Sequence, residues 1–226
     1  MSKLEGAVVL VVGASGGLGS RIATQLEAAG ARVIRAARNP ETLSGPNAFL
    51  ADLTAAGGPA AIVNSAGNAH GQLDGVVVAA GSVAFGPVAN VTDAAITELF
   101  EINALAPIRI IRESLPLLAA SAASGRQPFI VTFSGVVAET PTAGLAVYSA
   151  AKAALAGFMK AATRELRRDG IRMLDVRPGH TETGLSTRPI EGSAPAFPAG
   201  LDPDAVATRI VKAILDGEKD LPSTAF

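Results

Sequence analysis

One pair of residues in this sequence has the types and the spacing for proton transfer. Tyr148, the only tyrosine in the chain, lies in an apolar stretch with helical periodicity, and Lys152 follows it four residues later. Residues at this spacing share one face of a helix, so the phenol and the ammonium can lie close together. A nearby cation stabilises the phenolate of a tyrosine, whose pKa is otherwise about 10. The pair therefore predicts general acid/base chemistry.

A second candidate site is a glycine-rich turn near the N-terminus. The sequence passes from an apolar run, Val8–Val12, through Gly13, Gly17 and Gly19 into a helical stretch. Gly13 permits the tight turn, Gly17 lets the backbone approach a pyrophosphate, and Gly19 allows close packing of helix on strand. The helix N-terminus offers unpaired N–H groups to an anion. This context predicts a dinucleotide site rather than an ordinary glycine-rich turn, and we include Ser15 and Leu18 in it.

The residues after the second predicted strand, Arg32–Ala36, bear on which dinucleotide binds. An NAD site places an acidic residue here to hold the ribose 2′-hydroxyl, but the chain continues with Ala37 and Arg38. The planar fork of Arg38 can instead pair with a 2′-phosphate. The pattern favours NADP(H) over NAD; the simpler interpretation is a solvated arginine at a strand end.

These residues need a parallel sheet to bring them together. Short apolar runs alternate with helical stretches, as in right-handed βαβ units. We expect one α/β domain over residues 1–226, a Rossmann fold whose doubly wound, mostly parallel sheet has about seven strands with helices on both faces. Pro107 and Pro116 predict that the helical stretch 94–119 is two helices or one kinked helix. The six predicted strands are Val8–Val12, Arg32–Ala36, Ala48–Leu50, Gly75–Val78, Phe129–Phe133 and Ile171–Val176.

Composition narrows the function classes. Hydrophobic residues make up 49% of the 226 residues and aromatic ones 4%, which is typical of the aliphatic core of a buried parallel sheet. The formal net charge is -1, so the sequence shows no excess of positive charge that would attract nucleic acid or an anionic membrane. No cysteine is present and the two histidines, His70 and His180, are far apart, so we predict no metal site. The apolar run Ala7–Val12 is too short to span a membrane, and we expect a soluble, cytoplasmic protein.

Taken together, these motifs resemble those of the short-chain dehydrogenase/reductase family along the whole chain. The glycine spacing G-x-x-x-G-x-G and the pair Y-x-x-x-K are the family's forms. The resemblance implies that Tyr148 is the acid/base, that Lys152 also hydrogen-bonds the nicotinamide ribose, and that Asn103 holds a water linking Lys152 to solvent. Without it, Asn103 could simply be a polar residue satisfying a kinked helix near Pro107.

The resemblance also implies further cofactor contacts. An Asp-hydrophobic pair, Asp52 and Leu53, would contact the adenine ring, although Asp52 alone would suggest only a helix cap. The remaining contacts implied are Ala80 and Gly81 after the fourth strand, Pro178 and Gly179 beside the nicotinamide, and Thr183 at its carboxamide.

Two positions depart from the family's pattern. Ala79 replaces an asparagine that normally ties neighbouring strands together, and Gly135 stands where the catalytic serine is expected. Three alternatives remain open: Ser134 acts through a turn or bulge that re-aims its side chain, Thr132 substitutes for it, or no hydroxyl polarises the substrate carbonyl. Losing such a donor typically costs about 10²–10³ in rate.

The sequence thus predicts reversible hydride transfer between NADP(H) and a small carbonyl compound or secondary alcohol. The alternative, kept open by Gly135, is a catalytically impaired NADP(H)-binding regulatory or scaffold protein of the same fold. The proline- and glycine-rich loop Ser186–Gly200 corresponds to a substrate lid, and its length makes it functional or disordered. His180 has no partner recognisable from sequence and is interpreted as a loop residue. The family resemblance implies a homodimer or homotetramer.

Overall fold

A computed structural model describes residues 4–38, 43, 48–50 and 52–226. They form a seven-stranded sheet in the order β3-β2-β1-β4-β5-β6-β7, with every neighbouring pair parallel. The predicted doubly wound α/β fold is therefore confirmed. The strands are β1 Val8–Val12, β2 Arg32–Ala37, β3 Ala48–Leu50, β4 Gly75–Val78, β5 Phe129–Phe133, β6 Arg172–Val176 and β7 Asp220–Leu221.

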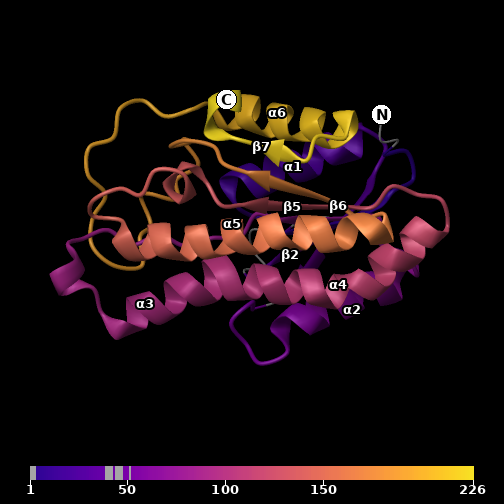
Figure 1. Cartoon of the computed structure of the whole chain (residues 1–226), viewed down its shortest axis with the longest axis horizontal. Coiled ribbons are helices and arrows are strands. Elements are labelled where there is room, and N and C mark those ends of the chain that lie inside the picture. The colour runs from indigo at the N-terminus through magenta and orange to yellow at the C-terminus, as the bar shows by residue number, and fades with distance from the viewer. Residues whose placement is uncertain (1–3, 39–42, 44–47, 51) are drawn as a thin grey trace.

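Helices cover both faces of this sheet (Figure 1). They are α1 Gly17–Ala28, α2 Gly58–His70, α3 Asp93–Phe100, α4 Ala106–Ala123, α5 Ala146–Leu166 and α6 Pro203–Asp216. In Figure 1, α1 and α6 lie on one side of the sheet and α2, α4 and α5 on the other. Among the described residues, no helix combines the length and apolarity needed to cross a bilayer.

The central strand β1 shows why both faces need cover. Its five residues are all apolar and buried, and successive side chains on a strand point to opposite faces. Val8, Leu10 and Val12 belong to the core beneath α2, α4 and α5. Val9 and Val11 belong to the second core, beneath α1 and α6. A strand buried on both faces is thus hydrophobic throughout, as parallel sheets require.

The central helical stretch is divided by one wide turn. α3 ends at Phe100, the π-helical turn Glu101–Leu105 follows, and α4 continues from Ala106. Pro107, which has no N–H, cannot form the α-helical bond to the carbonyl four residues earlier, and the wide turn accommodates it. The predicted interruption therefore falls just before Pro107, whereas α4 continues through Pro116.

The strand order places a binding site at a particular edge of the sheet. β2 and β3 lie on one side of β1, and β4 to β7 lie on the other, so the direction of winding reverses between β1 and β4. Open α/β sheets bind ligands outside the carboxyl ends of their strands at such a switch point. The glycine-rich turn follows β1 at this position, and the segment containing Ala79 to Gly81 follows β4.

Candidate active site

A cavity of about 650 Å³ opens at the carboxyl edge of the sheet. Its walls come from the segments that follow β1, β2, β4, β5 and β6, together with the start of α5 and the lid loop. The predicted site residues that line it are Gly13, Ser15, Gly17, Leu18, Arg38, Leu53, Ala80, Gly81, Tyr148, Lys152, Pro178, Gly179 and Thr183. Gly19, Asp52, Asn103 and Ser134 lie outside this lining.

The glycines form a cradle with no room for side chains. Gly13 has a φ of +81°, and a Cβ there would lie 2.6 Å from the nitrogen of Ala80. A Cβ on Gly17 would lie 2.6 Å from the Cβ of Thr183, and one on Gly19 would lie 2.1 Å from the Gly13 carbonyl oxygen. No side chain caps the N-terminus of α1, and its first turn holds no acidic residue. This cradle fits a diphosphate held by backbone N–H groups.

Of the residues predicted to bind the adenosine part of the cofactor, Arg38 and Leu53 line the cavity and Asp52 does not. Arg38 is exposed and lines the cavity, and the buried Leu53 forms part of the wall nearby. Asp52 is exposed and binds Thr54 instead, accepting bonds from its hydroxyl at 2.7 Å and its N–H at 2.9 Å. These two bonds, with a smaller attraction from Arg38, lower the pKa of Asp52. Because α2 begins only at Gly58, Asp52 stabilises a turn and does not cap a helix.

Tyr148 and Lys152 project from the start of α5 into the same cavity. The Lys152 Nζ lies 5.7 Å from the centre of the Tyr148 ring and donates to the Phe133 carbonyl at 2.7 Å. Burial lowers the pKa of Lys152 to about 8, although Asp175 opposes this shift. Burial raises the pKa of Tyr148 to about 12. This shift is opposite to the lowering expected beside Lys152, because burial disfavours the charged phenolate.

Asn103 lies in the π-helical turn, fully buried beside the lysine. Its Nδ2 donates to the carbonyls of Ser82 at 2.9 Å and Leu99 at 3.0 Å, and its Oδ1 accepts from the Ser82 N–H at 3.3 Å. A Cβ on Gly81 would lie 3.1 Å from this Oδ1 and 3.7 Å from the Lys152 Nζ. Asn103 thus fixes the turn after β4 next to Lys152, a role that the sequence analysis did not predict.

The hydroxyls at the end of β5 point away from the cavity. Ser134 donates to Asp175 Oδ2 at 2.6 Å, and Thr132 donates to Asp175 Oδ1 at 3.3 Å. Both residues are fully buried, whereas Gly135, with a φ of +71°, lines the cavity. The turn after β5 therefore does not re-aim Ser134, and its predicted catalytic role is not supported. Of the three alternatives, the structure matches the one without a hydroxyl from this strand.

His180 lines the cavity and does have partners. Its Nε2 lies 3.4 Å from Glu182 Oε1, and its ring stacks on Phe197 of the lid loop with centroids 4.5 Å apart. The sequence analysis identified no partner for it, because neither contact follows a recognisable motif. These two contacts hold the His180 ring in the wall of the cavity.

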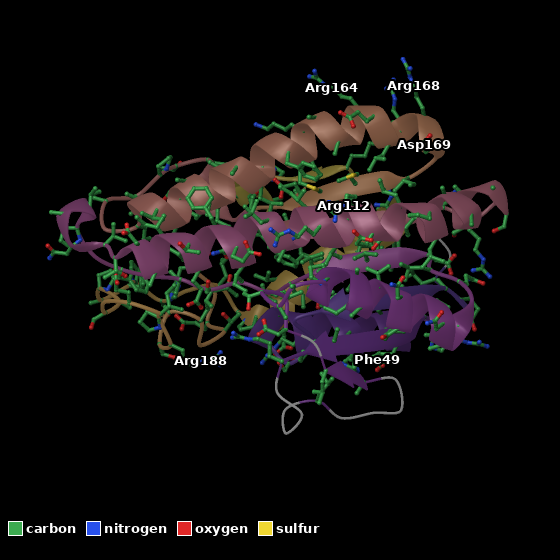
Figure 2. All side chains as sticks on the ribbon, turned by 90° about the horizontal axis from the view of Figure 1, so that it is seen from below. Phe49, Arg112, Arg164, Arg168, Asp169 and Arg188 are labelled. Atoms are coloured by element: carbon green, nitrogen blue, oxygen red, sulfur yellow. The ribbon has the colours of Figure 1, made fainter. Side chains whose placement is uncertain are left out.

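The lid loop is held against the segment that follows β4. Phe85 donates its N–H to the Glu191 carbonyl at 2.9 Å, and a Cβ on Gly192 would lie 1.7 Å from the Phe85 carbonyl oxygen. The loop has little regular structure, and these contacts hold it beside the cavity. Figure 2 shows Arg188, on this loop, on the side of the molecule opposite Arg164 of α5 and Arg168 just beyond that helix.

An apolar cluster lies between the lid loop and the acid/base pair, and sequence reasoning missed it. It consists of the buried residues Val83, Phe85, Val137 and Leu145, and Tyr148 packs against it. All of these residues line the cavity. They come from connecting segments without periodicity, so no sequence pattern marked them.

Comparisons with known proteins agree with this geometry. A family model described as short chain dehydrogenase matches residues 7–192. Ketoacyl reductase HetN of Nostoc is 34% identical over 229 residues, covering 95% of this chain and 77% of the relative. Short-chain dehydrogenases are oxidoreductases that use nicotinamide cofactors.

Solved structures show the same fold. A short chain dehydrogenase from Burkholderia cenocepacia in complex with NADP superposes with a TM-score of 0.82 at 24% identity, covering 99% of this chain and 90% of that one. A 3-ketoacyl-(acyl-carrier-protein) reductase from Brucella melitensis complexed with NADH gives 0.81 at 24% identity, covering 93% and 91%. The family match over most of the sequence shows that the protein belongs to the short-chain dehydrogenase family of oxidoreductases.

Proposed function

We propose that the protein is an NADP(H)-dependent reductase of apolar carbonyl compounds that can also oxidise the corresponding secondary alcohols. The observation that carries the proposal is one cavity lined by the glycine cradle, Arg38, Tyr148 and Lys152. The nicotinamide, when bound, supplies or accepts the hydride. Every other requirement falls to residues of the chain: holding the diphosphate, placing the carbonyl and moving one proton.

The proton would come from Tyr148. With its pKa raised to about 12 by burial, the phenol is protonated at neutral pH, which suits a general acid for carbonyl reduction. The Lys152 ammonium, 5.7 Å from the ring centre, would stabilise the phenolate that forms as the proton leaves. In the oxidation direction Tyr148 must first lose its proton, so we expect reduction to be the faster direction near pH 7.

NADP(H) is favoured over NAD(H) by the chemistry at the end of β2. Arg38 borders the cavity where the adenine ribose would lie, and its guanidinium can bind a 2′-phosphate with two parallel hydrogen bonds. Ala36 and Ala37 also line this part of the cavity, so β2 offers no carboxylate to a ribose 2′-hydroxyl.

The substrate side of the cavity is apolar, and β5 supplies no hydroxyl there that would polarise the substrate carbonyl. Val83, Phe85, Val137 and Leu145 offer an apolar surface to the groups that flank the carbonyl. A second cavity of about 330 Å³ also has Phe85, Leu145 and Tyr148 in its walls, and we propose that it takes the tail of a longer substrate. With Gly135 in place of a hydroxyl donor, we expect turnover about 10²–10³ slower than with a polarising serine.

The test is NADPH oxidation with a panel of aldehydes and ketones, with Tyr148→Phe as the matched control. We expect turnover that falls by about 10²–10⁴ in the variant while NADPH affinity stays within about twofold. Equal turnover in both proteins would remove Tyr148 from the mechanism. NADPH binding without turnover above the variant, for every substrate, would instead indicate a nucleotide-binding regulatory or scaffold protein.

We also propose a small-molecule substrate and a homodimer or homotetramer as the working form. Mass measurement at micromolar concentration tests the assembly, since a monomer under those conditions contradicts it.

A further inference from the structure

A buried ionic cluster lies behind the active-site cavity, and the proposed mechanism makes no use of it. Its centre is Arg177, which follows β6 and is 7% exposed. The guanidinium donates to Asp175 Oδ2 at 2.8 Å, to the two carboxylate oxygens of Asp220 at 2.7 and 2.8 Å, and to Glu139. The cluster joins β6, β7 and the turn after β5.

Asp175 connects this cluster to the end of β5. Its two oxygens accept the hydroxyls of Ser134 at 2.6 Å and Thr132 at 3.3 Å. Phe133, the residue between them, points its carbonyl at the Lys152 Nζ, 2.7 Å away. One carboxylate therefore fixes the residues on both sides of the carbonyl that holds the lysine.

Of the three carboxylates around Arg177, Asp175 is the one whose charge acts on Lys152. Three carboxylates, on Asp175, Glu139 and Asp220, face one guanidinium, on Arg177. Burial opposes ionisation of Arg177, but its bonds to the three carboxylates raise its pKa overall. Burial likewise opposes ionisation of Glu139, but bonds from Ser223 and Arg177 lower its pKa overall. The bonds within the cluster thus favour the charged forms of Arg177 and Glu139.

We propose that Asp175 is a positioning residue for Lys152: it anchors Thr132 and Ser134, so that the Phe133 carbonyl meets the ammonium, and its charge favours the ammonium form. The proposal rests on the proposed role of Lys152 beside Tyr148. It also gives the Ser134 hydroxyl a function, as a support behind the site.

The pH dependence follows from burial and charge. Burial lowers the pKa of Lys152 to about 8, and Asp175 counteracts part of that shift. Neutralising Asp175 lowers the pKa further, so the ammonium is lost at a lower pH than in the wild type. Among the other titratable groups, Tyr148 lies on the same helix, 5.7 Å from the ammonium by its ring centre, and the same cavity is lined by Arg38, Glu98, His180 and Arg188. From β5 the lysine contacts the neutral Phe133 carbonyl, and the neutral amide of Asn103 lies next to Gly81, as the lysine does.

The experiment compares Asp175→Asn with the wild type in two measurements between pH 6 and 9: NADPH affinity by fluorescence titration, and turnover. Asparagine keeps the shape and removes the charge. We expect the midpoint of the alkaline loss to move down by about one pH unit or more in both measurements, with near-normal values at pH 6. Asp220→Asn is the matched control, because it removes a carboxylate from Arg177 that accepts no bond from β5; its midpoint should not move.

A second variant separates charge from position. Thr132→Val combined with Ser134→Ala keeps the Asp175 charge but removes its hold on β5. We expect a several-fold loss of turnover without a change of midpoint, and this variant carries the test if Asp175→Asn does not fold.

An unchanged midpoint in Asp175→Asn, or an equal shift in Asp220→Asn, overturns the charge effect, and normal turnover in the double variant overturns the anchoring. If no substrate is turned over at all, the proposed function fails, yet the NADPH titration still decides the role of the charge.

Discussion

The two halves of the cavity are built on different principles. The cofactor half is defined by backbone: glycines that leave no room for a Cβ and a helix N-terminus without a cap. The catalytic half is defined by side chains that meet from distant segments, such as Ser134 on Asp175 and Asn103 on Ser82. A backbone-built site is marked by short local motifs. A site built from side-chain contacts depends on pairings that only the folded chain reveals, so changes in the two halves should have different signatures.

The largest effect should come from filling the backbone cradle. A Cβ on Gly17 would lie 2.6 Å from the Cβ of Thr183 and 2.9 Å from its backbone, so Gly17→Ala must displace one of the two segments. We expect nucleotide affinity to fall by at least about 100-fold, roughly the loss of two charge-assisted hydrogen bonds. Isothermal titration with NADPH measures it.

The matched control for that change is Gly157→Ala. Gly157 lies on α5 with nothing within 4 Å of its would-be Cβ, so alanine should raise the free energy of unfolding by about 0.5–1 kcal/mol and leave binding unchanged. If both variants bind NADPH like the wild type, the cofactor half is less constrained than its geometry indicates.

A smaller effect is expected from a side chain in the cofactor half. Arg38→Ala should weaken NADPH binding by about tenfold to a hundredfold and leave NADH binding unchanged, because only NADPH carries a 2′-phosphate. Arg32→Ala, an exposed arginine at the other end of β2, is the control. Equal losses for both nucleotides, or tighter NADH binding by the wild type, would remove the case for NADP(H).

The smallest effect concerns the substrate side. Each methylene added to a methyl ketone should improve kcat/KM by about fourfold while the tail enters apolar space. Val147 lines the second cavity and is absent from the lining of the first, so Val147→Trp should remove this gain for long ketones only. Ala150→Trp, exposed on the same helix, is the control. A chain-length series that is flat in the wild type contradicts the proposed tail site.

The elements defined by backbone and by continuous apolar runs are also the ones that the sequence predicts. Four of the six predicted strands, β1, β3, β4 and β5, have the predicted bounds. β1, β4 and β5 are buried strands, which carry continuous apolar runs, whereas β3 is a short edge strand with exposed residues. The cradle was predicted because its glycine-rich turn directly follows one of these apolar runs. β7, with two residues, is too short to show any period. The sequence analysis does not predict α2. This helix begins at Gly58 and is followed by Gly71, and glycine has a low helix propensity.

In the catalytic half of the cavity, only contacts within one helix can be predicted from the sequence. Tyr148 and Lys152 are four residues apart on one helix, so their proximity follows from spacing. Ser134 and Asp175 are 41 residues apart, and no pattern links them until β5 and β6 pair. The raised pKa of Tyr148 depends on how much water the surrounding loops exclude, which spacing does not encode.

The π-helical turn Glu101–Leu105 has one more consequence. Such a turn holds about one residue more than an α-helical turn, and one residue corresponds to about 100° of rotation around a helix axis. Asn103 lies fully buried within this turn, while α3 and α4 each keep their own buried side. Deleting a single residue here would rotate every following side chain of α4 by that angle relative to α3. The orientation of one amide and the packing of a whole helix thus depend on the same residue count.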